Sequence, residues 1–390
     1  MKETTLEKAK SLQDWIVEKR RNFHSHPELS YKEYRTSKII KEELEKMGIE
    51  TSSIGETGVV GLIKGKEGGK VIGLRADIDA LPVTEQTGLP YASENPGVMH
   101  ACGDDAHASM LLGAARILSG MKDELKGTVK LIFQPAEEDG TGAQRMIDGG
   151  VLKNPDVDFI VGMHVFSDYP AGKIVIQEGP LMASGDQFIA EIYGKQCHGS
   201  APWQGVDANI CAMAIVQALQ TLVSRVNDAR SPIVVNVGVI NGGERFNITS
   251  GKAILDGANR TFSQETREKL PGWIENIVKG FCYAYGCEYK FEYLYRCAVV
   301  VNDVDGTKKI KESMEELIGA ENVINTEMIM GSEDFSMYQL KTKGTFMLLG
   351  VRNEEKGCTY PIHSEHFTID EDVLSTGAAG YVEAALTYLK

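Results

Sequence analysis

Residues 99–109, MHACGDDAHAS, place several metal-binding side chains close together in the chain. The segment holds two histidines, one cysteine and two adjacent aspartates. Thiolates, imidazoles and carboxylates are the usual protein ligands of divalent metals. The spacing of Cys102 and Asp104 fits no zinc finger. A metal site here therefore needs further ligands from other parts of the chain.

The adjacent carboxylates Glu137 and Glu138 are a second candidate pair. They follow the apolar run LIF and precede the glycine-rich stretch DGTGA. Neighbouring carboxylates at the end of a strand point in different directions, so one can bind a metal while the other handles a proton. An isolated pair is most often solvated surface charge, but the apolar strand before this one favours a functional role.

Each remaining candidate has an ordinary structural alternative. His164 ends an apolar strand, where a single histidine is most often a core residue, and His363 alone would be an unremarkable loop residue. Cys102 could be only a small buried hydrophobic residue. Together, however, these side chains supply a thiolate, carboxylates and imidazoles from the ends of separate strands or from loops. A hydrolytic metal site is built from such scattered ligands.

The elements that position these residues alternate between strand and helix. Apolar spacing and short apolar runs indicate the type of each element, and the predicted strands carry polar residues at their ends. Open α/β sheets place their functional sites at such strand ends. The predicted elements are helices over 5–21 and 35–47, strands over 58–63 and 70–82, a helix over 106–120, and strands over 127–138 and 157–165.

The pattern changes near 183–187. A β-α-β-β-α-β order follows, which is typical of a small two-layer α+β unit. After about residue 296 the first pattern resumes, with a helix over 304–318 and a strand over 344–350. The predicted elements of the middle unit are strands over 186–193, 233–240, 252–262 and 289–295, a helix over 206–224, and a helix over 264–285 that Pro271 breaks near its start.

The composition excludes several classes of function. The 390 residues carry a net charge of −14, which argues against nucleic-acid binding because phosphate contacts need clustered Lys and Arg. The N-terminus has no apolar signal region, and no run reaches the roughly 20 apolar residues of a membrane span. Seven scattered cysteines without a CxxC pair favour a reducing compartment. We therefore predict a cytoplasmic protein with no membrane partner.

Several segments resemble the metal-dependent N-acyl-amino-acid amidohydrolase or aminoacylase family. This family includes aminoacylases, hippurate hydrolases, auxin-conjugate hydrolases and N-acetyldiaminopimelate deacetylases. The resemblance runs in order from about residue 12 to 385. The segments that carry it are RRNFHSHPELSYKEYRTS, LRADIDALP, MHACGDDAHASMLLGAA, FQPAEEDGTGAQRMI, GMHV, GKQCHGSAPWQGVDA, LDGANRTF, MGSEDFS and PIHSEHF.

The resemblance implies roles for these residues. Glu137 matches the general base that takes a proton from water, and Asp79 matches a supporting acid beside the metals. His198 matches a histidine that polarises the scissile carbonyl, in several relatives across a dimer interface. The positions that match the family's metal ligands are Cys102, Glu138, His164 and His363.

Asn247 and Arg260 fall near the positions that hold the substrate's carboxylate in the family. A guanidinium fork suits a free carboxylate. The segment FNITSGK lacks the proline that is usual at this turn. A turn role for Asn247 and a surface ion pair for Arg260 therefore stay open as alternatives.

Asp104 departs from the family pattern, which has a metal-binding histidine at this position. Asp104 could be a ligand by substitution, which would favour harder ions such as Mn²⁺. It could instead weaken one metal position, or the chain could be a non-catalytic relative that only binds acyl-amino acids. We favour a working ligand, because the other matched site residues are all present.

We predict an α/β fold in which a mixed-sheet metallohydrolase catalytic domain, 1–184 and 296–390, carries an inserted two-layer α+β lid and dimerisation domain, 185–295. The predicted activity is hydrolysis of the amide bond of N-acyl-L-amino acids with one or two divalent ions, Zn, Mn, Co or Ni. The alternatives are a dipeptidase or carboxypeptidase, and a catalytically weakened binding protein. The expected partners are a small-molecule substrate and a second copy of the chain, in a dimer or a dimer-based tetramer.

Overall fold

The computed structural model describes residues 3–66 and 68–390, and the chain divides into two compact units. Unit 1 comprises the described residues up to Gly179 together with Val301–Glu327 and Asp334–Lys390. Unit 2 comprises Pro180–Val300 and Met328–Glu333. The chain passes between the units within the short strands β7, Gly179–Met182, and β12, Val300–Asn302.

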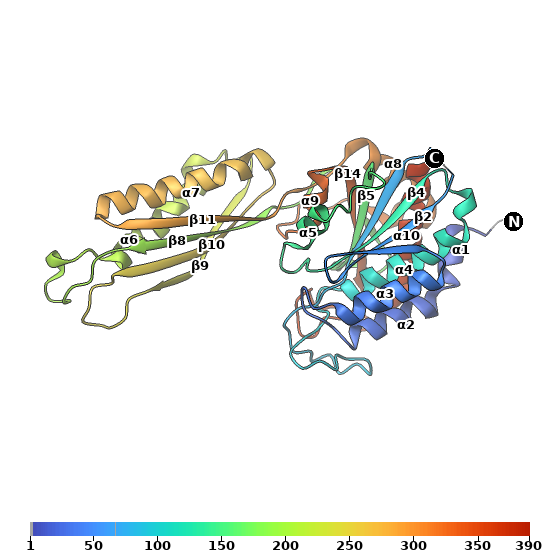
Figure 1. Ribbon diagram of the computed structural model, residues 1–390, viewed down its shortest axis with the longest axis horizontal. Coiled ribbons are helices and arrows are strands. Elements are labelled where there is room, and N and C mark those ends of the chain that lie inside the picture. Colours follow the sequence, from blue (N-terminus) through green and yellow to red (C-terminus); the bar gives the residue numbers. More distant parts are fainter. Residues whose placement is uncertain (1–2, 67) are drawn as a thin grey trace. The chain divides into compact units, whose positions relative to one another are not determined.

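Unit 1 is built on an eight-stranded mixed sheet with the strand order β1-β2-β4-β3-β5-β14-β6-β13 (Figure 1). The central strands β4, β3, β5 and β14 run parallel to one another, and the β1-β2, β2-β4 and β14-β6 pairs are antiparallel. The strands are β1 Glu50–Ile54, β2 Gly58–Lys64, β3 Val71–Asp77, β4 Thr128–Gln134, β5 Phe159–Pro170, β6 Ile174–Val175, β13 Val323–Ile324 and β14 Lys343–Arg352.

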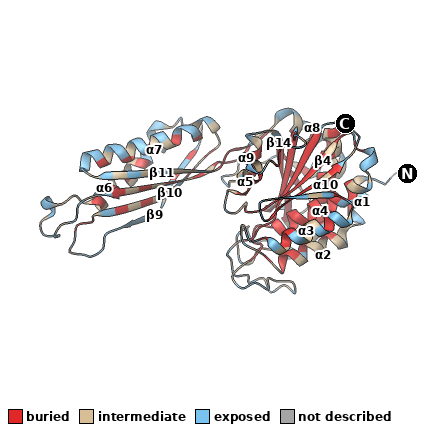
Figure 2. Ribbon diagram, in the orientation of Figure 1, coloured by how far each residue is buried: buried red, intermediate tan, exposed pale blue. Residues whose placement is uncertain are grey.

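Helices cover this sheet and complete its core. Helices α4 and α10 pack against the central strands, while α2 and α3 pack on α4. Buried residues fill the central strands and these two inner helices (Figure 2). The helices of unit 1 are α1 Thr5–Lys10, α2 Gln13–His24, α3 Tyr34–Lys46, α4 Asp104–Gly120, α5 Gly142–Asp148, α8 Val304–Ile318, α9 Phe335–Gln339 and α10 Leu374–Leu389.

The register of the parallel strands brings polar residues to one edge of the sheet. Every residue of β3 is buried, as expected for a parallel strand covered on both faces. Asp77 at the end of β3 pairs with Gln134 at the end of β4. Arg75 pairs with Gly162 of β5, so His164 lies level with Asp77. Since these strands are parallel, their carboxyl-end residues gather at the same edge.

Unit 2 is a two-layer α+β structure with an antiparallel sheet of order β11-β8-β10-β9. Its helices α6 and α7 pack on one face of that sheet, around a core that includes Phe188, Leu255, Ile215 and Ile274. The elements are β8 Gly185–Tyr193, α6 Ala208–Thr221, β9 Ile233–Gly242, β10 Lys252–Thr261, α7 Gln264–Tyr285 and β11 Glu288–Cys297. The predicted β-α-β-β-α-β order is confirmed.

Two predicted helices differ from the structure. The region 5–21 forms two helices, because α1 ends at Lys10 and the Ser11 hydroxyl donates to the carbonyl of Lys8. Helix α7 is continuous through Pro271, so the predicted break is wrong. A proline removes only one backbone donor, and core contacts of Leu270 and Ile274 on either side hold the helix together.

One helical stretch in the described chain, Ala208–Val226, is long and apolar enough to cross a membrane by length and composition. One face of α6 lies in the core of unit 2, through Cys211, Ile215 and Leu219. The other face exposes Ile210 and Met213. A single helix that meets these criteria is weak evidence for a membrane span, because core helices meet them too.

Candidate active site

Three predicted metal ligands meet around the Cys102 thiol at the carboxyl edge of the sheet in unit 1. The Cys102 Sγ lies 3.3 Å from His164 Nε2 and 3.3 Å from His363 Nε2. His363 Nε2 lies 3.7 Å from Glu138 Oε2. The ligand atoms of Cys102, Glu138 and His363 all lie within 4.8 Å of one another, close enough to share a metal ion.

Hydrogen bonds aim both histidines at the thiol. His164 Nδ1 lies 2.5 Å from the carbonyl of Val165, to which it donates, so Nε2 keeps its lone pair toward Cys102. Burial and the nearby His107 lower the pKa of His164 to about 3, which keeps its imidazole neutral, as a metal ligand must be. His363 has a φ of +68° and donates its backbone N–H to Ala101. Such backbone strain in a non-glycine residue persists where the surroundings fix it, often at functional sites.

Asp79 fixes the loop that carries the two glutamates after β4. Its Oδ1 accepts from the backbone N–H of Glu137 at 2.8 Å, and its Oδ2 accepts from that of Glu138 at 3.2 Å. The Ser30 hydroxyl also donates to Oδ2, at 2.6 Å. Asp79 is buried, and this clamp fixes the backbone of both glutamates. Asp79 therefore supports the site through the backbone.

Asp104 is the first residue of α4 and is 2% exposed. Its Oδ2 has no hydrogen-bond partner among the described residues. The preceding Gly103 has a φ of +101°, and a Cβ there would lie 2.3 Å from Val165 Cγ2. Only glycine meets both demands, so Gly103 lets α4 begin close to β5 and places Asp104 in the interior.

Asp104 groups with Asp77 and His107, whose ligand atoms lie within 4.8 Å of one another. Both ring nitrogens of His107, however, already have hydrogen-bond partners. Its Nδ1 lies 2.5 Å from Asp77 Oδ1, and its Nε2 accepts from the backbone N–H of Val165 at 2.8 Å. His107 therefore holds β5 and α4 together, while Asp104 keeps an oxygen available for a ligand.

The accumulated negative charge fits a bound cation. Burial, followed by the carboxylates of Asp77 and Asp79, raises the pKa of Asp104 well above its usual range. Burial, followed by Glu138, likewise raises the pKa of the Cys102 thiol. A bound metal ion would replace the protons on such ligands and stabilise their charged forms in spite of the burial. The donor set and the orphaned Asp104 oxygen therefore fit a divalent metal.

His198 and Asn247 lie together in unit 2. His198 forms an isolated bridge with Ile248, and the N–H of Gly199 donates to the carbonyl of Asn247 at 2.8 Å. The N–H of Ser200 donates to His198 Nδ1, which leaves Nε2–H of the neutral ring as a donor. The exposed His198 ring can thus donate a hydrogen bond to a substrate oxygen.

Arg260 lies at the opposite end of the same sheet. The β8-β10 ladder runs from Lys252 to Asn259, with His198 beyond its first end and Arg260 beyond its second. At about 3.3 Å per residue, the side chains of His198 and Arg260 are on the order of 25 Å apart. The guanidinium Nη1 of Arg260 donates to the carbonyl of Met330 at 2.8 Å. Within unit 2, Asn247 and Arg260 therefore cannot hold one small carboxylate together.

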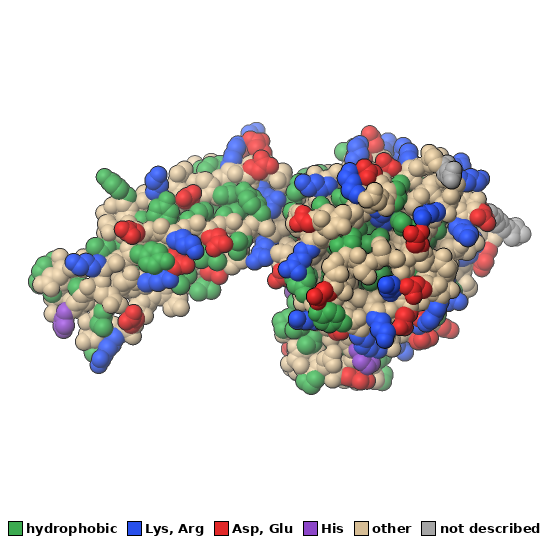
Figure 3. Space-filling view, in the orientation of Figure 1, with side chains coloured by type: hydrophobic (Ala, Val, Ile, Leu, Met, Phe, Trp, Pro, Cys, Tyr) green, Lys and Arg blue, Asp and Glu red, His purple; other side chains and the backbone are tan. Residues whose placement is uncertain are grey.

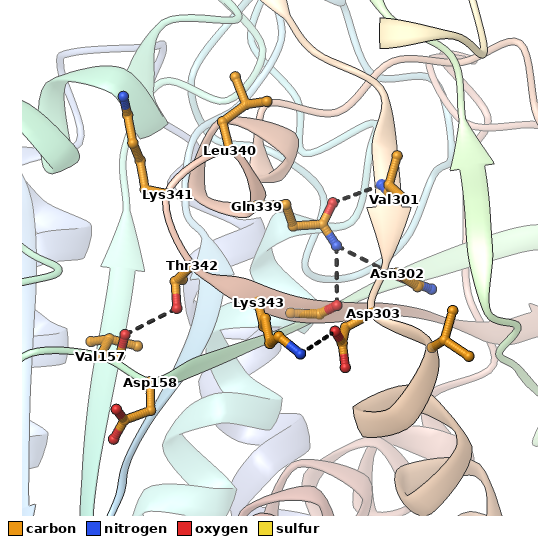
Figure 4. A pocket seen from close by; sticks show the side chains of 12 residues that line it. Val157, Asp158, Val301, Asn302, Asp303, Gln339, Leu340, Lys341, Thr342 and Lys343 are labelled. Atoms are coloured by element: carbon orange, nitrogen blue, oxygen red, sulfur yellow. Dashed lines mark hydrogen bonds and ion pairs between the residues drawn. The ribbon is translucent and has the colours of Figure 1, made fainter.

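A large pocket of unit 1 does not contain the candidate residues. It has a volume of about 720 Å³ and lies at the amino end of β14, beside Asp303, Gln339 and Lys343 (Figure 4).

A set of buried residues at the candidate site was not predicted from the sequence: Arg75, Asp77, His107, Gln134 and Asp334. Asp77 and Asp334 lie inside the motifs ADIDALP and MGSEDF. Their acidic side chains at the end of a strand and the start of a helix could have indicated them as site residues.

Comparison with known proteins identifies the family. The model described as "Peptidase family M20/M25/M40" matches residues 73–387. The chain is 42% identical over 386 residues to thermostable carboxypeptidase 1 of Saccharolobus solfataricus, covering 97% of this chain and 96% of that protein. It is 38% identical over 377 residues to N-acetylcysteine deacetylase of Bacillus subtilis, covering 96% and 97%.

A solved structure gives the same result. The crystal structure of the Bacillus subtilis YXEP protein, described as a dinuclear metal binding peptidase from the M20 family, matches with a TM-score of 0.84 and 36% identity. The match covers 97% of this chain and 99% of that one. The chain therefore belongs to peptidase family M20/M25/M40.

Family membership confirms the predicted resemblance, the α/β fold class and the prediction of a hydrolytic enzyme that acts on amides or peptides. The predicted requirement for divalent metal agrees with the family and with the donor group around Cys102.

Proposed function

We propose that the protein hydrolyses the amide bond of N-acyl-L-amino acids. The observation that carries the proposal is the meeting of Cys102, His164, His363 and Glu138 beside Glu137, whose backbone is clamped by Asp79. This arrangement separates ligands from a proton-handling carboxylate. The deacetylase and carboxypeptidase among the relatives act on bonds of this class by name.

The proposed ligands are Cys102, Glu138, His164, His363 and Asp104. When bound, one or two divalent ions would polarise the scissile carbonyl and bring the pKa of water toward neutrality. Asp104 adds a hard oxygen donor where the family pattern has an imidazole. We therefore propose that this chain favours harder ions such as Mn²⁺ more than its histidine-bearing relatives do.

Glu137 is the proposed general base. It would take the proton from the attacking water and pass it to the leaving amine. Its neighbour Glu138 faces His363 and would instead serve as a ligand. The clamp by Asp79 fixes the backbone of both glutamates, because both backbone N–H groups donate to one carboxylate.

His198, Asn247 and Arg260 are the proposed substrate-binding residues, with His198 stabilising the developing oxyanion. A substrate the size of an acyl-amino acid cannot span the distance between His198 and Arg260 within one unit 2. We therefore propose that His198 and Asn247 of one protomer serve the active site of a second copy. The proposed catalytic domain is 1–184 with 296–390, and 185–295 is the lid and dimerisation domain.

The surface of unit 2 supports a homodimer. Strand β9 lies at the edge of its sheet and hydrogen-bonds only to β10 among the described strands. It exposes Val239 and Ile240, while α6 exposes Ile210 and Met213. Exposed hydrophobic side chains lie on unit 2 in the face drawn in Figure 3. An open apolar edge strand is a ready site for pairing, and a two-fold axis would let β9 pair with the same strand of a second copy.

The proposed location is cytoplasmic. The seven cysteines of the described chain are free thiols, which is typical of a reducing compartment.

A substrate panel tests the activity. Protein stripped of metal and reloaded with Mn²⁺, Co²⁺ or Zn²⁺ is given acetyl-, benzoyl- and indole-acetyl-amino acids and dipeptides. We expect metal-dependent release of the amino acid from the acyl conjugates. Hydrolysis of dipeptides alone would favour the carboxypeptidase or dipeptidase alternative. Metal binding with no turnover of any substrate would favour the weakened binding protein.

A further inference from the structure

A buried network of charges, made of residues other than the proposed ligands, crosses the carboxyl edge of the sheet in unit 1. Its centre is Arg75 on β3, which is 0% exposed. The guanidinium donates through Nε to Gln134 Oε1, through Nη1 to Asp77 and through Nη2 to Asp334, each at 2.9 Å. Arg75 is therefore held in one orientation by partners from three segments.

Asp334 is the second fixed point of this network. It is 0% exposed and precedes α9. In addition to Arg75, its carboxylate accepts from Gln134 Nε2 at 2.8 and 2.9 Å and from the backbone N–H of Ala143 at 2.8 Å. Both carboxylate oxygens are thus occupied, and the backbone of Asp334 cannot move without breaking these contacts.

The backbone of Asp334 contacts the proposed base. Its N–H donates to Glu137 Oε1 at 3.2 Å. The main chain of Glu137 is fixed from the other side by Asp79. A fixed donor aimed at a carboxylate oxygen orients the other oxygen for proton transfer without reorganisation during the reaction.

Stability alone is a poor explanation for the network. Buried ion pairs cost desolvation and can often be replaced by apolar residues without loss of stability. Here the network ends at Glu137, the proposed base, which lies next to the proposed ligand Glu138 and is not itself assigned as a ligand. The network therefore has a use in placing Glu137.

We propose that Asp334, held by Arg75 and Gln134, is a positioning residue for Glu137. Asp334 does not touch the substrate or the metals; it fixes the Glu137 carboxylate in the direction needed to take a proton. The proposal rests on the proposed role of Glu137 as the general base.

The test replaces Asp334 by asparagine. The asparagine NH₂ would face donors from Gln134, Ala143 or Arg75, so the loop that carries its backbone N–H must shift. We expect kcat to fall by about 10²-fold, the cost of displacing a catalytic group by about 1 Å. KM and bound metal, measured by elemental analysis, should stay unchanged, because neither substrate binding nor the ligands are altered.

A double-mutant comparison separates positioning from general damage. In a Glu137→Gln background, Asp334→Asn should cause no further loss of the residual rate, because the group that it positions is gone. A merely structural role would lower the rate by the same factor in both backgrounds. That result would overturn the proposal.

Asp303→Asn is the matched control. Asp303 also belongs to unit 1, pairs with Lys343 at 3.0 Å and caps the N–H of Gly306 at 2.8 Å (Figure 4). It lies at the amino end of β14, away from Glu137, so its loss should leave kcat unchanged. An Asp334→Asn variant that lowers kcat no more than Asp303→Asn would contradict the positioning role.

Gln134→Met keeps the test usable if Asp334→Asn fails to fold. It preserves the Arg75–Asp334 ion pair and removes the amide contacts to Asp334. We expect a smaller fall in kcat that again vanishes in the Glu137→Gln background, and equal losses in both backgrounds would overturn the proposal. Full turnover by Glu137→Gln alone would refute the proposed base. If Glu137→Gln loses its activity while Asp334→Asn keeps the wild-type kcat, only the positioning role of Asp334 would be refuted.

Discussion

Asp104 combines deep burial with an oxygen that lacks a partner in the described structure. Such a group is costly unless something charged binds it. Burial and the nearby Asp77 and Asp79 carboxylates raise its pKa well above the usual range, so a nearby cation would stabilise its charged form. These properties favour the interpretation of Asp104 as a working metal ligand over that of a damaged site.

The substitution Asp104→His tests this interpretation. We expect the metal content at saturation to stay the same or fall, and the preference for Mn²⁺ over Zn²⁺ to fall, because imidazole suits softer ions than carboxylate does. Elemental analysis after competitive loading measures both. Asp104→Asn, which keeps the size and removes the charge, should lose metal. A steep rise of both metal content and turnover in Asp104→His would show that the aspartate is a lesion.

At the scale of elements, the start of α4 determines where Cys102 and Asp104 lie. Gly103 has a left-handed backbone, and its missing Cβ leaves room for Val165 next to His164. The helix start, the end of β5 and the thiol thus depend on one glycine. The remaining proposed ligands, Glu138 and His363, lie on the loop after β4 and the loop before α10.

Gly103→Ala should damage this start. The left-handed backbone would cost roughly 1–3 kcal/mol, and the new Cβ would meet Val165 Cγ2. We expect a lower melting temperature together with reduced metal content. Gly120→Ala at the other end of α4 is the control, since a Cβ there meets nothing within 4 Å; it should be neutral or gain up to about 1 kcal/mol. Equal metal content in both variants would contradict the role of Gly103.

Periodicity and strand-end polarity were sufficient to predict much of the fold, including the mixed sheet and the inserted α+β order. They could not detect the break after Lys10, because the apolar spacing continues through it. The edge strand Glu50–Ile54 carries little apolar signal, with no buried residue. At the site, single residues with ligand chemistry were predictable, whereas the Arg75–Asp334 ion pair joins positions 259 residues apart and depends on the tertiary fold.

At the scale of the whole molecule, His198 and Arg260 lie too far apart in unit 2 to share one small substrate. This geometry and the open edge of β9 lead to the proposed dimer with shared active sites. An assembly of this kind makes each site depend on two chains. Mixed dimers can therefore test it directly.

Glu137→Gln and His198→Ala chains, co-expressed with different tags and purified as mixed dimers, should recover activity. Each variant alone should be inactive. In the mixed dimer, one site combines the intact Glu137 of one chain with the intact His198 of its partner, so about half of the wild-type activity is expected. Mixed dimers as inactive as the two parents would contradict the sharing of sites between protomers.

Glu137 and Glu138 have different proposed roles, and measurements of turnover and bound metal in one variant of each residue separate these roles. Glu137→Gln should lose about 10²–10⁴-fold in kcat, the usual contribution of a general base, and keep its metal. Glu138→Gln should lose both turnover and metal, because it removes a charged ligand beside His363. Retention of full activity in both variants would show that Glu137 is not the base and that Glu138 is not a required ligand.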